Sequence, residues 1–159
     1  MSEADGAITR AMTGHAFLAG ASPRTIELFS EGARLEEFET GTLLLREGEH
    51  ADTLYLLTEG RVAIEIHSPS QGPLTIDIVN PGHVVGLSWA APPFRWQFDA
   101  RALEPVKAVA LDAPRLFEKL ALHPEAAAEL HRRLSAVMLS RLQATRIRLL
   151  DLYANASRH

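Results

Sequence analysis

The chain has 159 residues, of which 47% are hydrophobic and 23% charged, a balance typical of one globular domain with its own core. Its formal net charge of −4 argues against direct nucleic-acid binding, which normally needs a basic face. The absence of cysteine excludes disulfides, zinc–thiolate sites, iron–sulfur clusters and cysteine nucleophiles.

The sequence also argues against a membrane protein. No apolar run approaches the roughly 20 residues that a membrane-spanning helix requires. The first five residues are acidic and lack the basic and then apolar layout of a signal peptide. We therefore expect a cytoplasmic protein without membrane association.

Short helical segments are predicted at the start of the chain. Residues 1–8 are expected to be disordered, and a weak helical pattern runs from 9 to 19. Ser22 and Pro23 then supply an N-cap and a first helical residue, and Gly32 is placed to end that helix.

Alternation of apolar and polar residues with period two dominates the middle of the chain. Segments of this kind are separated by glycine or proline turns and cover residues 35–38, 42–45, 53–58, 61–66, 74–79 and 106–111. Many short strands with such turns predict a mainly β fold, a barrel or jelly-roll-like β roll.

The last part of the chain is predicted to be helical. Asp112 caps a helix over 113–122, and Pro124 breaks it. A long helix follows over 125–154, and residues 155–159 form a tail. The predicted organisation is thus a β-roll domain at 9–124 with a long C-terminal helix.

The long helix has two apolar stripes. The wider stripe comprises Leu134, Met138, Leu142, Thr145, Leu149 and Leu152. The narrower one, nearly opposite, comprises Leu139, Ile147 and Leu150. Two stripes favour a helix that covers its own barrel and also pairs with a second copy, with the wider stripe assigned to the homodimer interface. Burial of both stripes in one subunit, or simple exposure of the narrower one, is the alternative.

An aromatic-rich segment from 82 to 102 stands out before the last strand. Alternation within it places Trp96, Phe98, Ala100 and Ala102 on one face. The polar residues Arg95, Gln97, Asp99 and Arg101 fall on the other face.

The turns around this segment resemble those of the cyclic-nucleotide-binding domain, the sensory domain of the catabolite activator protein and FNR class of regulators. The resemblance covers about 12–154 and is carried by Gly41, Glu47-Gly48-Glu49, Asp52, Leu54-Tyr55-Leu56-Leu57, Gly60-Arg61-Val62, Pro81-Gly82, Gly86 and Arg101-Ala102-Leu103-Glu104. It implies an eight-stranded β roll, a phosphate-binding cassette between two strands, and a C-terminal helix that dimerises and covers the pocket.

The polar positions of the cassette differ from that family. There, a glutamate after the cassette glycine binds the ribose 2′-hydroxyl, and an arginine at the next strand pairs with the phosphate. The corresponding positions here hold Leu87 and Trp96. The candidate ligand-binding residues of this degenerate cassette are Gly86, Leu87, Ser88, Trp89, Arg95, Trp96 and Phe98. Its aromatic rings suggest either a filled pocket or one that takes an apolar or planar ligand.

These features predict a non-enzymatic regulatory or sensor module that lacks a DNA-binding domain and has lost ordinary cyclic-nucleotide binding. One alternative is a genuine cAMP or cGMP domain that uses Arg95 and Ser88. Another is a protein-docking subunit of a larger enzyme complex, with a protein partner.

Enzyme classes that share the barrel are disfavoured. A cupin metal site needs a His-x-His pair, and His50, His67 and His83 are isolated. A hydrolase would need a nucleophile elbow, and Ser88 lacks the glycine-x-serine-x-glycine pattern. No metal is expected.

Overall fold

The computed structural model describes residues 2–158. The chain divides after residue 122 into two compact units, a β roll with short helices and a single long helix.

The first unit contains short helices at both ends and strands between them. In chain order its elements are α1 Glu3–Thr13, the 3₁₀ helix η1 Ala16–Leu18, α2 Pro23–Ser30, β1 Arg34–Phe38, β2 Leu43–Leu45, β3 Thr53–Glu59, β4 Val62–Ser68, β5 Gly72–Val79, β6 Val84–Val85, the 3₁₀ helix η2 Ser88–Ala90, β7 Asp99–Ala102, β8 Val106–Asp112 and α3 Ala113–Leu120.

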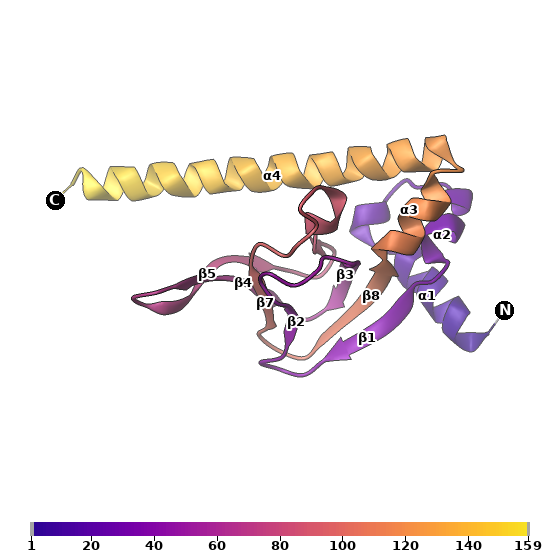
Figure 1. The fold of residues 1–159 in the computed structure, drawn as a ribbon, viewed down its shortest axis with the longest axis horizontal. Coiled ribbons are helices and arrows are strands. Elements are labelled where there is room, and N and C mark those ends of the chain that lie inside the picture. Colours follow the sequence, from indigo (N-terminus) through magenta and orange to yellow (C-terminus); the bar gives the residue numbers. More distant parts are fainter. Residues whose placement is uncertain (1, 159) are drawn as a thin grey trace. The chain divides into compact units, whose positions relative to one another are not determined.

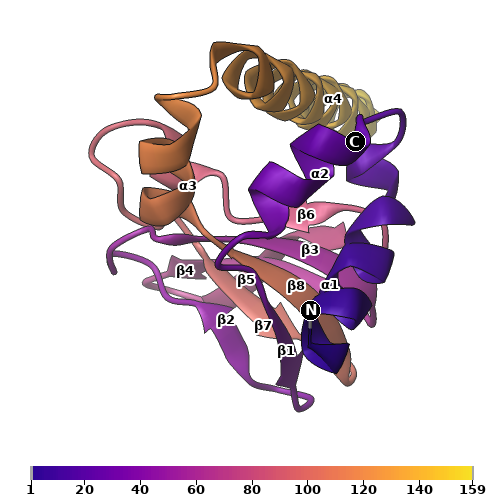
Figure 2. The same cartoon turned by 90° about the vertical axis from the view of Figure 1, so that its right-hand side faces the viewer.

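The strands form two antiparallel four-stranded sheets, in the orders β1-β8-β3-β6 and β2-β7-β4-β5. The short helices α1, α2 and α3 lie at one end of this roll, and the β4–β5 hairpin extends at the other (Figure 1). Figure 2 shows the roll from the helical end. The predicted fold, a mainly β roll with flanking helices and a long C-terminal helix, is confirmed.

The β3–β4 turn depends on a glycine. Gly60 has a φ of 82°, and a Cβ built on it would lie 2.3 Å from the carbonyl oxygen of Pro105. A side chain at this position would both strain the backbone and overlap a neighbouring loop. The turn allows β3 and β4 to contribute Leu54, Leu56 and Val62, all fully buried, to the core.

Arg101 on β7 links separate parts of the second sheet. Its Nε donates to Glu65 Oε1 on β4 at 3.0 Å, and its Nη1 donates to the Gly41 carbonyl at 2.8 Å. Glu65 is 9% exposed, so this arginine compensates a carboxylate that is largely removed from water.

The N-terminus corrects one prediction. Residues 1–8 are expected to be disordered, yet α1 begins at Glu3. Ser2 and Asp5 form a capping box, each side chain accepting a hydrogen bond from the backbone N–H of the other. Ile8 and Met12 are buried, so packing and capping together stabilise a helix whose local pattern is weak.

His15 connects the N-terminal helices to the sheet. Its Nδ1 accepts the backbone N–H of Phe17 at 3.2 Å, which leaves the proton on Nε2. Nε2 therefore donates to the Leu57 carbonyl on β3 at 2.8 Å. Burial lowers the pKa of His15, because a charged imidazole would lose hydration there, and nearby His83 acts in the same direction.

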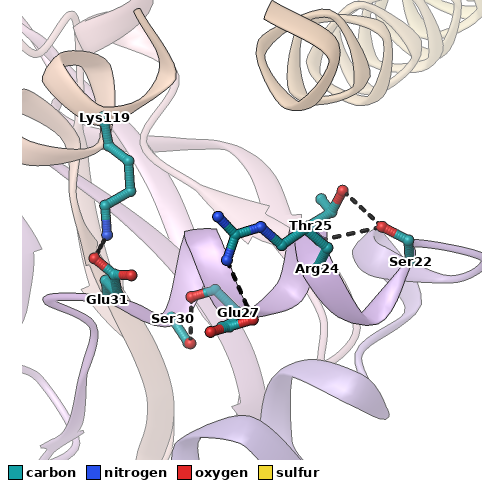
Figure 3. A network of polar contacts seen from close by, with 7 residues as sticks. All are labelled: Ser22, Arg24, Thr25, Glu27, Ser30, Glu31 and Lys119. Atoms are coloured by element: carbon teal, nitrogen blue, oxygen red, sulfur yellow. Dashed lines mark hydrogen bonds and ion pairs between the residues drawn. The ribbon is translucent and has the colours of Figure 1, made fainter. Parts of the chain in front are cut away.

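Polar contacts hold α2 and α3 at the helical end of the roll. Ser22 caps α2 by accepting the Thr25 N–H, and an ion pair joins Glu31 at the end of α2 to Lys119 on α3 (Figure 3). Arg24 pairs with Glu27 along α2 and is largely exposed, so we expect that pair to contribute little stability.

The second unit is the helix α4, Pro124–Ala156, a single helix of 33 residues. It extends two residues into the predicted tail. Leu134 is buried, whereas the other members of the wider stripe, Met138, Leu142, Thr145, Leu149 and Leu152, are exposed, as are Leu139, Ile147 and Leu150 of the narrower stripe. Across residues 2–158, no helix has the length and hydropathy needed to cross a membrane.

Candidate functional site

The cassette begins at a glycine that no other residue can easily replace. Gly86 follows the buried strand β6 and has a φ of 99°. A Cβ built there would lie 2.8 Å from the Thr53 carbonyl oxygen and 2.9 Å from Cη2 of Trp96. The glycine thus lets a neighbouring strand and an indole ring approach the cassette backbone.

Trp96 occupies the space beside this glycine. Its side chain is buried, with the residue 4% exposed. Its backbone N–H donates to the Glu49 carbonyl and its carbonyl accepts from the Gly48 N–H, both at 2.9 Å. These bonds to the β2–β3 loop hold the indole against Gly86.

Arg95 lies on the surface beside the same loop. Its Nη1 donates to the Gly48 carbonyl at 3.0 Å, and its backbone forms an isolated bridge with His50. Arg95 is the only lysine or arginine in residues 86–98. The cassette therefore has one cation, which is exposed and engaged with a backbone carbonyl.

The segment between Gly86 and Arg95 contains only a short helical turn. Leu87 is the N-cap of η2 and provides no capping side chain, and Ser88 is the first residue of that turn. Both are half-buried. A turn of three residues lacks the aligned peptide dipoles of a longer helix, so it is a weak anion-binding element.

Trp89 belongs to a different environment. It is 3% exposed, and its ring meets that of Phe117 on α3 edge to face, with centroids 5.0 Å apart and planes at 70°. Its buried indole nitrogen has no hydrogen-bond partner among the described residues. Phe98 is half-buried and precedes β7, which begins at Asp99. The predicted face of residues 96, 98, 100 and 102 is the more buried one, although the chain forms a strand only from Asp99 onward.

The structure thus brings together only part of the predicted set. Gly86 and Trp96 are in contact, Arg95 faces the β2–β3 loop, and Trp89 packs on α3. Sequence reasoning did not include Phe117, because its ring meets Trp89 across 28 residues of chain, and no local pattern signals that contact. Across residues 2–158, no group of three or more histidine, aspartate or glutamate side chains could hold a metal ion.

The family model of the cyclic nucleotide-binding domain matches residues 35–123, more than half of the chain. The chain belongs to this family. Common descent therefore explains why its glycine turns and β roll resemble those of the family.

One curated relative is a regulator of transcription. The CRP-like cAMP-activated global transcriptional regulator of Mycobacterium tuberculosis is 28% identical over 133 residues, which are 84% of this chain. The chain spans 58% of the length of that relative.

Solved structures of similar domains agree with the fold. A cyclic nucleotide-binding protein from Geobacter metallireducens is 26% identical, with a TM-score of 0.73, over 89% of this chain and 99% of that one. A cyclic nucleotide-binding domain from Methylobacillus flagellatus is 20% identical, with a TM-score of 0.78, over 92% and 83% of the two chains.

Proposed function

We propose that this domain is a non-enzymatic regulatory module that does not bind cyclic nucleotides in the usual way. The observation that carries the proposal is the buried Trp96, whose indole lies against Gly86 at the position where the family resemblance places the phosphate-pairing arginine. Leu87 likewise stands where the ribose-binding glutamate is expected. The module would act by docking on a protein partner or by sensing another ligand.

The physical argument rests on the charge of the ligand. A cyclic phosphate carries a negative charge, and burying it without a cation costs several kcal/mol. Arg95, the one cation of the cassette, is exposed and bonded to the Gly48 carbonyl. Trp96 also fills space beside Gly86 that a phosphate would need.

Calorimetric titration of cAMP and of cGMP into the purified chain tests this proposal. We expect no saturable heat up to about 1 mM nucleotide and no change in melting temperature. A ligand with a Kd of about 10 μM would stabilise the protein by about 2.7 kcal/mol at that concentration, which a thermal shift would detect. Micromolar binding would contradict the proposal and support the alternative in which Arg95 and Ser88 hold the phosphate. In that case Arg95→Ala should weaken binding by about 1.5–3 kcal/mol.

A gain-of-function variant sharpens the test. The double substitution Leu87→Glu with Trp96→Arg supplies both polar groups of the family pattern, and we expect it to acquire stabilisation by cAMP. Leu87→Glu alone is the matched control, because it keeps the indole. Circular dichroism verifies the fold of both variants before titration.

We also propose that α4 mediates a homodimer through the wider stripe. Met138 and Leu142 are each 46% exposed and Leu149 is 51% exposed, which leaves a row of apolar side chains in need of a partner surface. Leu142→Glu with Leu149→Glu should shift the protein to a monomer in sedimentation velocity. Leu139→Glu with Leu150→Glu on the narrower stripe is the matched control, and dissociation by the control pair alone would reassign the interface.

A further inference from the structure

A buried histidine joins three parts of the first unit that are far apart in the sequence. His15 follows α1, is the N-cap of η1 and is 5% exposed. Its Nε2 donates to the carbonyl of Leu57 on β3 at 2.8 Å. The same carbonyl accepts the backbone N–H of Gly82, in the turn between β5 and β6, at 2.9 Å. The N-terminal helices, β3 and the β5–β6 turn therefore meet at one peptide carbonyl.

The two nitrogens of the His15 ring have opposite roles. Nδ1 accepts the backbone N–H of Phe17 at 3.2 Å and is the side-chain cap of η1, whereas Nε2 carries the proton. A second proton can bind only at Nδ1, where it would point at the Phe17 N–H. Two N–H groups that face each other repel, and each is left without an acceptor. The observed arrangement therefore requires a neutral imidazole.

No carboxylate near His15 compensates a positive charge on its ring. Burial lowers the pKa of His15 more strongly than the Leu57 carbonyl raises it, and exposed His83 lowers it further. Among the described residues, His83 is the only titratable group that contributes to this shift. The titratable groups that do not contribute include Glu3, Asp5 and Arg10 on α1, and Tyr55 and Glu59 on β3.

The segment that His15 holds packs on the roll without belonging to either sheet. Phe17 and Leu18 of η1 are 8% and 1% exposed, so the segment is docked and not loose. Both four-stranded sheets are formed by β1 to β8, all of which follow it in the chain. The segment can therefore open locally without breaking a strand pair.

We propose that His15 is a pH-sensitive switch: a proton taken up from water by Nδ1 breaks the cap of η1, and the segment from η1 to the start of α2 opens from β3 while both sheets stay folded. The Phe17 N–H and the Leu57 carbonyl then bond to water. The proposal goes beyond the loss of nucleotide binding, and the cAMP titration has no bearing on it.

The direction of the response follows from proton linkage. In the open segment His15 has its ordinary pKa of about 6.5, whereas in the closed segment its pKa is lower. The open form therefore binds the proton more readily. The equilibrium constant for opening is constant above about pH 6.5 and rises by up to about 10-fold per pH unit below it, until the closed form also titrates.

Amide hydrogen exchange of the unmodified chain, followed by NMR between pH 7.5 and 5.0 and corrected for intrinsic rates, tests the switch. The reporters are the N–H of Phe17, bonded to Nδ1, and that of Leu18, bonded to the His15 carbonyl at 3.0 Å. The buried β3–β8 ladder is the reference. We expect the reporters to be at least about 100-fold less protected than the ladder, as local opening requires. Below about pH 6.5 their protection should fall by up to about 10-fold per pH unit.

A pair of substitutions assigns the response to the His15 ring. Asparagine at an N-cap can accept the Phe17 N–H but does not titrate, so His15→Asn should abolish the pH dependence of the reporters. His83→Asn is the matched control, because it removes the exposed neighbouring histidine, and it should retain that dependence.

Three results would overturn the proposal. The first is reporter protection that does not change between pH 7.5 and 5.0, and the second is equal protection of the reporters and the ladder, which would mean that they exchange only by global unfolding. Both are measured on the unmodified chain and do not depend on a variant folding correctly. The third is a pH dependence that persists in folded His15→Asn.

Discussion

The β roll and its cassette differ in what they retain of the family pattern. In the roll, Gly60 and Gly41 occupy turns with positive φ, and Arg101 links the Glu65 carboxylate to the Gly41 carbonyl. In the cassette, Gly86 also has a positive φ, but the two positions that the family resemblance assigns to polar anchors hold Leu87 and Trp96. Backbone geometry is therefore alike in both regions, whereas the proposed loss of ligand chemistry concerns only the cassette.

This difference shows which residues the fold itself requires. A polar anchor for a nucleotide contributes to binding and not to closure of the sheets, so its loss leaves the roll intact. A buried indole in its place adds apolar contacts to the core. Under the proposed function, the cassette would thus remain as structure without the chemistry of the usual ligand.

The largest expected effect comes from removing the aromatic residue that distinguishes the cassette. Trp96→Ala should lower the free energy of unfolding by about 3–5 kcal/mol, because a buried indole is replaced by a cavity. Urea denaturation measures it. Phe98→Ala is the control, with a smaller loss because Phe98 is half-buried. A loss below about 1 kcal/mol for Trp96→Ala would show that the ring is not part of the core.

The roll should respond almost as strongly at a glycine turn. Gly60→Ala is expected to cost about 2–4 kcal/mol, from backbone strain and from overlap with the Pro105 carbonyl. Gly41→Ala is the matched control, because Gly41 has a φ of 87° with nothing within 4 Å of a built Cβ, and it should cost only about 1–2 kcal/mol. Equal losses in urea denaturation would mean that strain alone governs these turns.

The hydrogen bonds of His15 should make the free energy of unfolding depend on pH. Burial lowers its pKa in the folded protein, whereas the unfolded histidine has a pKa of about 6.5. The unfolded chain therefore binds the proton more readily. The stability contributed by neutral His15 is complete above about pH 6.5 and is lost as the pH falls toward the lowered folded pKa, by at most about 1.4 kcal/mol per pH unit.

Denaturation of the wild type between pH 7.5 and 5.5 checks this slope. His15→Gln should reduce the loss, while His50→Gln, which changes an exposed histidine, should retain it. A slope unaffected by His15→Gln would assign the pH dependence to other groups.

The smallest effect is expected at the cation of the cassette. Arg95→Ala should change the free energy of unfolding by no more than about 0.5 kcal/mol, because Arg95 is exposed and makes one side-chain bond to the Gly48 carbonyl. A loss above about 2 kcal/mol in urea would reveal a role in holding the β2–β3 loop that its exposure does not suggest.

The sequence alone determined the class of fold. Each of the signals used depends only on residues that are close in the sequence. These signals are the strand alternation, the glycine turns and the long helical pattern. They predicted the β roll, α2, α3 and the extent of α4 to within a few residues. The first half of α1 was missed, although its last residues lie in the segment predicted to be weakly helical, because its stability comes from the Ser2–Asp5 capping box and the burial of Ile8 and Met12.

Tertiary structure decided which side chain of the cassette is buried. The sequence predicted that Leu87 and Trp96 stand at the polar positions of the family, but a one-residue shift in alignment would have placed Arg95 in the pocket instead. Only the folded chain fixes which of the two neighbours is buried, because Gly48 and Glu49, nearly 50 residues away, bind the Trp96 backbone. The hydrogen bond from His15 to Leu57 is likewise invisible in the sequence, since the two residues are 42 positions apart and meet only when the N-terminal helices pack on β3.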